Sequence, residues 1–246
     1  MKECIILGCG ATHAECKYHC ETWGVNGTFY IAKRLDKLFM TDEPSEVQAC
    51  YYDMEQIYAA DKRTLEHNGR GLTFVFPIAY PKFQDLGIPI EIYPVEEIVK
   101  SFKTSFFSNS IAYMLAYALY KGYDKIWFFG IDMLTSSTYV QEKGGVEFWM
   151  GVANGMSKER IAQGLPPIEI INTIGSATGK TYNGKMYGYY GQLESEAMKE
   201  GLFAPWDMVR VAKEGDEQDE WIKDPMSQEF KMVRAHRKAG EEIVVR

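Results

Sequence analysis

The stretch SNSIAYMLAYALYKGYDKIWFFGID, residues 108–132, joins a polar segment, a helix and a buried strand that ends on a carboxylate. Apolar residues recur through 111–119 with the 3.6-residue period of a helix, and Gly122 is the residue type that ends one. The apolar run 126–129 is typical of a parallel strand covered on both faces. Asp132 therefore falls just beyond the carboxyl end of a strand, where open α/β sheets bind ligands.

The polar residues Ser108, Asn109 and Ser110 precede this predicted helix and are of the types that cap helix N-termini. Hydroxyl groups and the free backbone N–H groups of a first helical turn can together hold an anion. We therefore predict that this segment contacts the phosphate or the sugar of a ligand.

The amino terminus shows the same order of strand and polar turn. Residues 4–7 predict a buried strand, and Gly8 and Gly10 in the following GCGATH allow a sharp turn whose N–H groups could face a phosphate. The full dinucleotide fingerprint has a third glycine before the helix, where this chain has His13. The loop therefore does not favour NAD.

Further apolar runs predict more strands, and helical segments alternate with them along the chain. Two of these strands end beside polar residues, Asn26 and Asp42. The alternation predicts an α/β fold with a Rossmann-like parallel sheet and helices on both faces. The remaining predicted strands and helices are residues 22–26, 37–40, 72–77, 90–92 and 166–171 and residues 45–60, 95–100 and 145–154.

Four segments carry a resemblance to a known family: GCGATH, WGVNGTFY, DKLFMTD and SNSIAYMLAYALYKGYDKIWFFGIDM. In this order and at these distances they resemble the Rossmann-like sialyltransferases of bacterial surface-glycan synthesis. Those enzymes have a GNGPS-type loop, a strand ending in Asn, and a T-S-G segment whose helix leads to a strand closing on GID. The segments are also similar to archaeal-type 6-hydroxymethylpterin diphosphokinases and to phage proteins that share this core. The resemblance covers roughly residues 3–150.

In the sialyltransferases the glycine loop, the Asn and the T-S-G segment hold the cytidine nucleotide of the donor. This chain departs from their pattern, because Ala-Thr stands where Pro-Ser is expected and SNS replaces T-S-G. The family also uses a pair of Tyr on the phosphate, and the residues that could supply them here are Tyr139, Tyr187, Tyr189 and Tyr190. The nucleotide-binding residues that the resemblance implies, with the further candidates in the same loops, are Gly8, Gly10, Thr12, Asn26, Ser108, Asn109, Ser110, Gly130, Tyr187 and Tyr189.

The resemblance does not supply a general base. The sialyltransferases use a His beyond the GID strand, but the last His of this chain is His236, in a charged tail. The remaining candidates for accepting a proton are Asp132, Glu142 and His13. We expect glycosyl transfer from a CMP- or UDP-type nucleotide sugar, and the acceptor stays open between a glycan, a small molecule and a modified DNA base.

Two other functions stay open on the same residues. A diphosphokinase would use Asp42 and Asp132 to hold Mg²⁺ between phosphates. A non-catalytic protein could keep the nucleotide site and lack the base.

Length and charge limit these functions further. A chain of 246 residues with 46% hydrophobic residues predicts one domain, residues 1–192, with a charged helical extension, residues 193–246, packed on it. The net charge of −7 disfavours broad contact with DNA. No apolar run approaches a membrane span and no signal peptide precedes the first strand, so we expect a cytoplasmic protein. The sequence is compatible with a monomer and with an oligomer.

Five cysteines, an odd number, indicate reduced thiols. Cys16, His19 and Cys20 would fit one helical turn as zinc ligands. Structural zinc sites usually use paired C-x-x-C spacings, however, and this chain has none. The sequence therefore favours small buried side chains over a metal site.

Overall fold

The computed structural model describes residues 1–41, 53–80, 87–133 and 137–173, with side chains from residue 142 in the last range, and four strands within 208–245. The chain divides into two compact units, Met1–Gly179 and Lys180–Arg246. Among the described helices, none has both the length and the apolar character that crossing a membrane requires.

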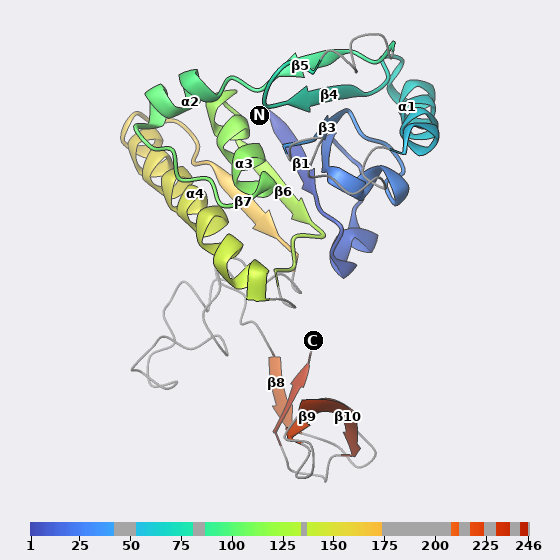
Figure 1. The fold of residues 1–246 in the computed structure, drawn as a ribbon. Helices are drawn as coiled ribbons and strands as arrows, with labels where there is room; N and C mark the ends of the chain where they lie inside the picture. Colours follow the sequence, from blue (N-terminus) through green and yellow to red (C-terminus); the bar gives the residue numbers. More distant parts are fainter. Residues whose placement is uncertain are drawn as a thin grey trace. The chain divides into compact units, whose positions relative to one another are not determined.

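The first unit contains a seven-stranded parallel sheet with the strand order β5-β4-β3-β2-β1-β6-β7 (Figure 1). The predicted parallel α/β fold is confirmed, and each strand lies within a few residues of its predicted position. The strands are β1 Glu3–Leu7, β2 Glu21–Val25, β3 Lys37–Phe39, β4 Thr73–Phe76, β5 Ile90–Ile92, β6 Lys125–Phe129 and β7 Glu169–Asn172.

Helices cover both faces of this sheet, as predicted. Alternate side chains of β1 point to opposite faces, so Cys4 and Ile6 join one hydrophobic cluster and Ile5 and Leu7 join the other. The first cluster includes α2, α3 and α4, and the second includes α1 and the segment after β2 (Figure 1). The helices are α1 Met54–Asn68, α2 Val95–Phe102, α3 Ser110–Tyr120 and α4 Ser137–Ala162, with 3₁₀ turns η1 Ala11–Glu15 and η2 Asn26–Tyr30.

Helix α3 is the most deeply buried helix of the first unit, which explains its nearly continuous apolar sequence. Asn109 is its N-cap, and its side-chain Oδ1 accepts a hydrogen bond from the Ala112 N–H at 2.9 Å. After the helix, Gly122 has a φ of +72°, which L-residues rarely adopt. The stretch from the cap to β6 therefore folds as its sequence predicts.

Helix α4 is longer than the predicted segment 145–154. The prediction was too short because glycines within the helix obscure its periodicity. One of them, Gly145, has a packing reason. A Cβ atom at this position would lie 2.0 Å from Oγ of Ser108, so a side chain here would displace the loop before α3. The helix predicted over 45–60 begins at Met54 instead, while residues 45–52 lie outside the described part.

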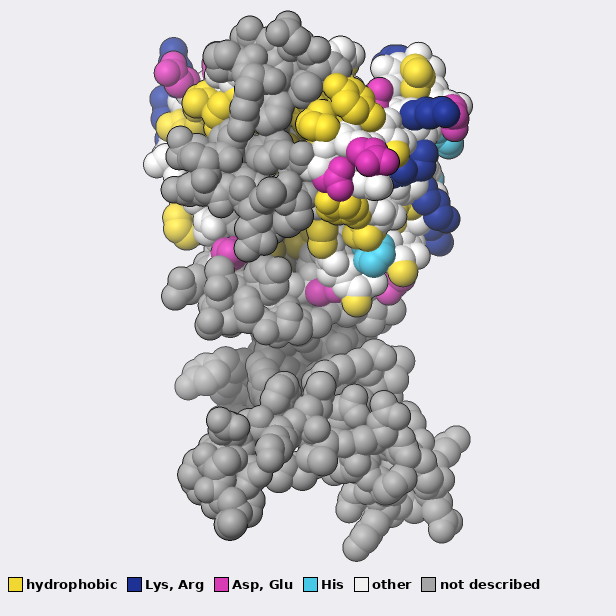
Figure 2. Space-filling view, turned by 45° about the vertical axis from the view of Figure 1, so that its right-hand side comes forward, with side chains coloured by type: hydrophobic (Ala, Val, Ile, Leu, Met, Phe, Trp, Pro, Cys, Tyr) yellow, Lys and Arg dark blue, Asp and Glu magenta, His cyan; other side chains and the backbone are white. Residues whose placement is uncertain are grey.

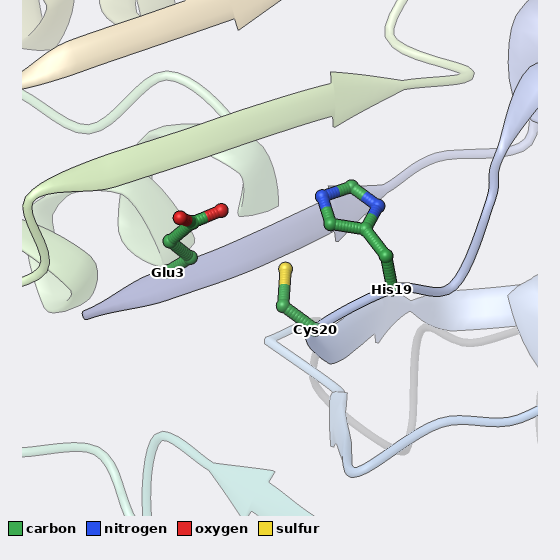
Figure 3. Close-up of side chains that lie close together, drawn as sticks. All are labelled: Glu3, His19 and Cys20. Carbon is green, nitrogen blue, oxygen red and sulfur yellow. The ribbon is translucent and has the colours of Figure 1, made fainter. Parts of the chain in front are cut away.

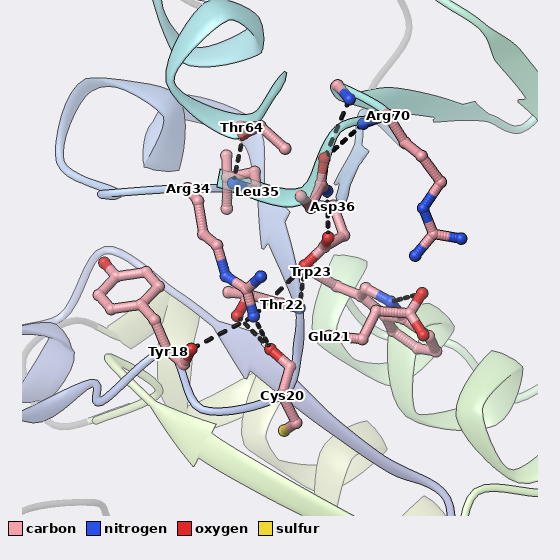
Figure 4. Close-up of polar contacts among 12 residues, drawn as sticks. Tyr18, Cys20, Glu21, Thr22, Trp23, Arg34, Leu35, Asp36, Thr64 and Arg70 are labelled. Atoms are coloured by element: carbon pink, nitrogen blue, oxygen red, sulfur yellow. Dashed lines mark hydrogen bonds and ion pairs between the residues drawn. The ribbon is translucent and has the colours of Figure 1, made fainter. Parts of the chain in front are cut away.

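Asp36 holds the amino ends of several strands together (Figure 4). Its carboxylate accepts hydrogen bonds from the Thr22 N–H at 2.8 Å and from Nδ2 of Asn68 at 2.6 Å. Its backbone also bonds to Thr22 O and to Thr73 N. This one residue thus connects β2, β3, β4 and the end of α1.

The second unit contains strands where the sequence predicted a charged helix. β9 (Glu217–Lys223) pairs antiparallel with β10 (Phe230–His236), and β8 (Met208–Val211) pairs antiparallel with β11 (Glu242–Val245). The helical prediction for 193–246 is therefore wrong where this region is described. High charge content suggested a solvated helix, but valines in β8 and β11 favour strands.

Figure 2 shows the surface of the molecule from one side. Lys and Arg side chains lie mainly toward the right of its described part, with acidic and hydrophobic side chains beside them. The expectation that DNA is disfavoured as a partner stays a prediction.

Candidate functional site

A cavity of about 540 Å³ lies at the carboxyl ends of the central strands. The chain runs outward from β1 to β5 and then returns to β6 on the other side of β1, so this position is the topological switch point of the sheet. Four loop segments and one side chain line the cavity: residues 8–11, 25–27, 109–111 and 130–133, and Glu142. Segments predicted from three strand ends and one helix cap therefore meet at one place.

The glycines of the β1 loop allow it to touch the β6 loop directly. The Gly8 N–H bonds to Phe129 O and the Gly10 N–H bonds to Gly130 O, each at 2.8 Å. A Cβ atom on Gly8 would lie 2.3 Å from the Gly130 oxygen, and Gly130 itself has a φ of +68°. Glycine is thus required because the backbones of two loops of the protein approach each other closely.

Asp132 fastens these two loops to each other. Its Oδ2 accepts a hydrogen bond from the Thr12 N–H at 3.1 Å, and its Oδ1 accepts one from the Thr12 hydroxyl. Oγ1 of Thr12 in turn accepts the Gly130 N–H at 2.9 Å. Asp132 lines the cavity, but both of its carboxylate oxygens already have donors, and Thr12 acts behind it rather than in the cavity wall.

The three polar residues before α3 have three different partners. The Ser108 hydroxyl donates to the backbone oxygen of Glu142 and accepts the Gly145 N–H at 3.1 Å, which ties the loop to α4. Asn109 caps α3, and the Ser110 hydroxyl shares a hydrogen bond with that of Thr41. Asn109 and Ser110 line the cavity, whereas Ser108 supports it from behind.

Glu142 brings a second carboxylate to the cavity from α4. Its Oε2 receives a long hydrogen bond from Nδ2 of Asn109, at 3.5 Å. The carboxylate therefore lies near the N-terminus of α3, where the helix dipole stabilises negative charge. Glu142 therefore has fewer hydrogen bonds from the protein than Asp132 has.

Two residues of the cavity wall have left-handed backbone conformations. Asn26 has a φ of +47° and Met133 a φ of +53°. Such angles are uncommon for residues other than glycine, and they occur often at functional sites. Asn tolerates the conformation better than most residues. Met133 and the exposed Cys9 were not predicted as site residues, because neither residue type signals a backbone position or a ligand contact.

The other predicted site residues lie elsewhere. Nδ1 of His13 lies 2.8 Å from the Gly10 carbonyl oxygen, and His13 is not among the residues that line the cavity. Asp42, Tyr187 and Tyr189 lie outside the described residues.

The helical turn that a zinc site of Cys16, His19 and Cys20 would need does not form, since the segment is irregular and Tyr18 has a φ of +51°. Cys16 lies in the hydrophobic core, as does Cys4. Both are small buried side chains, as expected, and this burial raises the pKa of their thiols.

A smaller cavity of about 340 Å³ lies at the amino ends of β2, β3 and β4. Two of its cationic side chains have partners within the protein. Arg34 lies 3.9 Å from Asp36 and donates to Cys20 O (Figure 4), and Lys37 pairs with Glu91 of β5. These contacts hold the sheet edge together, so the cavity at the carboxyl ends is the better candidate for a ligand.

No protein-family model and no curated protein matches the chain. Solved structures of a sialyltransferase are similar to it. The Campylobacter jejuni sialyltransferase CstII with the substrate analogue CMP-3FNeuAc is 16% identical, with a TM-score of 0.44, over 82% of this chain and 99% of that one. A mutant of sialyltransferase Cst-II with CMP is 16% identical, with a TM-score of 0.49, over 74% of this chain and 87% of that one. The sialyltransferase Cst-II in complex with a trisaccharide acceptor and CMP is 15% identical, with a TM-score of 0.46, over 70% of this chain and 80% of that one. These similarities are too distant to transfer a ligand to this chain.

Proposed function

We propose that this protein is a glycosyltransferase whose nucleotide-sugar donor binds in the cavity at the carboxyl ends of β1, β2 and β6. The observation that carries the proposal is the meeting of a helix N-terminus and a weakly bound carboxylate, Glu142, in a cavity at the switch point. The volume of about 540 Å³ falls within the range of small-molecule sites.

The α3 N-terminus is the proposed site of the donor phosphate. Backbone N–H groups at the start of a helix point at an anion and stabilise the charge that builds up on a leaving phosphate. Asn26, which also lines the cavity, carries an amide of the kind that bonds to the base or the ribose of a nucleotide.

Glu142 is the proposed general base. It accepts the proton of the acceptor hydroxyl while the hydroxyl oxygen bonds to the anomeric carbon of the donor sugar. The bond between that carbon and the phosphate oxygen breaks, and its electron pair leaves with the nucleotide. Asp132 positions the β1 and β6 loops that form the wall of the cavity.

A CMP- or UDP-type donor is the finer part of the proposal, and it rests on the resemblance of the sequence motifs. No observation in the described residues favours a diphosphokinase. Asp42 lies outside them, and both oxygens of Asp132 are bound by Thr12.

The experiment measures binding first and turnover second. Thermal shifts with CMP, UDP, GDP, ATP and NAD, with and without Mg²⁺, identify the nucleotide, because a ligand of the native state raises the melting temperature. The matching nucleotide sugars are then tested for release of free nucleotide. We expect CMP or UDP to bind and its sugar to be slowly hydrolysed. Binding of ATP alone with a strict Mg²⁺ requirement, or of no nucleotide, would contradict the proposal.

A further inference from the structure

Glu3, His19 and Cys20 lie together beside the amino end of β1. One ligand atom from each, a carboxylate oxygen, an imidazole nitrogen and the thiol sulfur, lies within 4.8 Å of the other two. Figure 3 shows the three side chains turned toward one shared space. Cys16, the third ligand considered from the sequence, lies in the core, and Glu3 takes its place in this group.

Pairing in the sheet brings Glu3 and Cys20 together. Cys4 of β1 lies opposite Glu21 of β2, so the residues one step earlier on each chain are neighbours. Glu3 also points to the same face of the sheet as Ile5, by the alternation of side chains along β1. Glu3 is the first residue of β1 and Cys20 directly precedes β2, so the strand pairing places the two residues side by side.

Trp127 of β6 holds the other parts of the group. Its Nε1 donates a hydrogen bond to Oε2 of Glu3 at 3.2 Å. Its ring meets the imidazole of His19 edge-on, with 4.8 Å between ring centroids and an interplanar angle of 88°. A hydrogen bond of this kind orients a carboxylate ligand of a metal site, so Trp127 orients Glu3.

The three groups form a donor set suited to zinc. Thiolate, imidazole and carboxylate are its usual protein ligands, with bond lengths of about 2.3, 2.0 and 2.1 Å. In a tetrahedral site these lengths place ligand atoms about 3.3 to 3.8 Å apart. Separations of up to 4.8 Å therefore need movements of roughly 1 Å, which the exposed His19 can make by rotating its side chain.

We propose that Glu3, His19 and Cys20 bind one Zn²⁺ ion, with water as the fourth ligand. Binding releases the Cys20 thiol proton to solvent. The site lies roughly 16 Å along the strand from the cavity, the length of β1 at about 3.3 Å per residue. The ion connects the irregular segment before β2 to β1.

The experiment uses the full chain, treated with EDTA and then titrated with Zn²⁺ or Co²⁺ alone. We expect one Zn²⁺ per chain, a raised melting temperature, and a thiolate-to-Co²⁺ absorption band in the near ultraviolet. Cys20→Ser should remove the band, and Glu3→Gln and His19→Ala should each weaken Zn²⁺ binding at least tenfold. Cys9→Ser, which changes an exposed thiol at the other end of β1, serves as the control and should bind as the unchanged chain does.

Failure to bind Zn²⁺ at micromolar concentration would overturn the proposal. So would a cobalt band that persists in Cys20→Ser and disappears in Cys9→Ser, because the thiolate would then belong to another site. Circular dichroism of each variant confirms that a lost band reflects a lost ligand rather than unfolding. The readouts do not involve a nucleotide, so this test is independent of the proposed transferase activity.

Discussion

Two carboxylates reach the cavity, but their surroundings differ. Both oxygens of Asp132 accept hydrogen bonds from Thr12, while Glu142 receives a single long hydrogen bond from Asn109. A carboxylate whose oxygens are both held by donors of the protein is less free to contact the hydroxyl group of an acceptor. We therefore assign positioning to Asp132 and proton transfer to Glu142.

Removing the charge of Glu142 tests this assignment. We expect Glu142→Gln to lower turnover of the nucleotide sugar by about two orders of magnitude, the usual contribution of a positioned general base. Its melting temperature should stay close to that of the unchanged chain. Glu159→Gln, the same change at an exposed position of α4, should leave turnover unaltered. Equal turnover in both variants would exclude Glu142 as the base.

The matching change at Asp132 should act on stability. An amide cannot accept both Thr12 hydrogen bonds, so we expect Asp132→Asn to lower the free energy of unfolding by about 1 to 3 kcal/mol. Urea denaturation measures this loss. An Asn variant with unchanged stability and strongly reduced turnover would return Asp132 to the chemistry.

At the scale of single residues, the sequence predicts where the site lies better than what each residue does. The requirement for glycine at Gly8 and Gly10 is visible in the sequence, but its partner, the Gly130 backbone, comes from β6, over 100 residues later. Asn109 is predictable as a cap because capping is local. The bonds of Asp132 to Thr12 join distant segments, and a pattern within one segment does not reveal them.

At the scale of elements, Asp36 is the residue on which the amino edge of the sheet depends. We expect Asp36→Ala to destabilise the protein by about 2 to 4 kcal/mol, because backbone and amide donors in β2 and at the end of α1 would lose a half-buried acceptor. Urea denaturation compares it with Glu66→Ala, an exposed change on α1 that should have little effect. Similar unfolding midpoints for the two variants would count against this role.

Glu91 links β5 to β3 and α3 through Lys37 and Tyr117. Partial burial alone would raise the pKa of Glu91, but hydrogen bonds from these two residues outweigh it and hold the pKa below its usual range. A lowered carboxyl pKa stabilises the fold above the unfolded-state pKa, and this stabilisation is lost as the pH falls through the folded-state pKa.

The pH dependence of Glu91→Gln should follow from this sign. We expect the variant to be less stable than the unchanged chain at about pH 7, with the difference shrinking toward about pH 3. Unfolding midpoints in urea across this range measure it, with the exposed Glu97→Gln as the control. A difference that stays constant or grows toward low pH would contradict the link.

Elements with strong local patterns are predictable, and the exceptions have physical reasons. The helix at α3 and the strand at β6 follow from their apolar content and caps. The full length of α4 was missed because Gly144 and Gly155 flank the predicted segment 145–154, and glycine commonly marks the end of a helix. The strands within 208–245 were missed because the high charge content of this region suggested a solvated helix, although valines in β8 and β11 favour strands.

At the scale of the whole molecule, the first unit contains the cavity and the residues of both proposals. Met1–Gly179 contains the complete seven-stranded sheet, both hydrophobic clusters, the cavity and the proposed zinc ligands. The sequence predicted the parallel sheet and its two covered faces. The strand order followed from pairings across the chain, which no single segment encodes.

A chain ending at Gly179 should therefore fold by itself. We expect a cooperative thermal transition and the circular dichroism of an α/β protein, since all core residues of the two described clusters belong to this unit. Nucleotide binding by this shortened chain should equal that of the full chain if the cavity alone binds the donor. A non-cooperative transition would show that residues 180–246 are needed for folding.

The direct contact between Gly8 and Gly130 also limits which walls of the cavity substitutions can reshape, and thus how the preference for the proposed donor could be altered. Where these loops meet, the cavity wall is peptide backbone, whose amide and carbonyl groups stay the same whatever side chains surround them. Substitutions at Val25, Ile111 or Met133 would reshape the remaining walls and leave this backbone surface intact. Libraries that vary those three positions are thus a direct route to altered sugar or nucleotide selectivity on an unchanged scaffold.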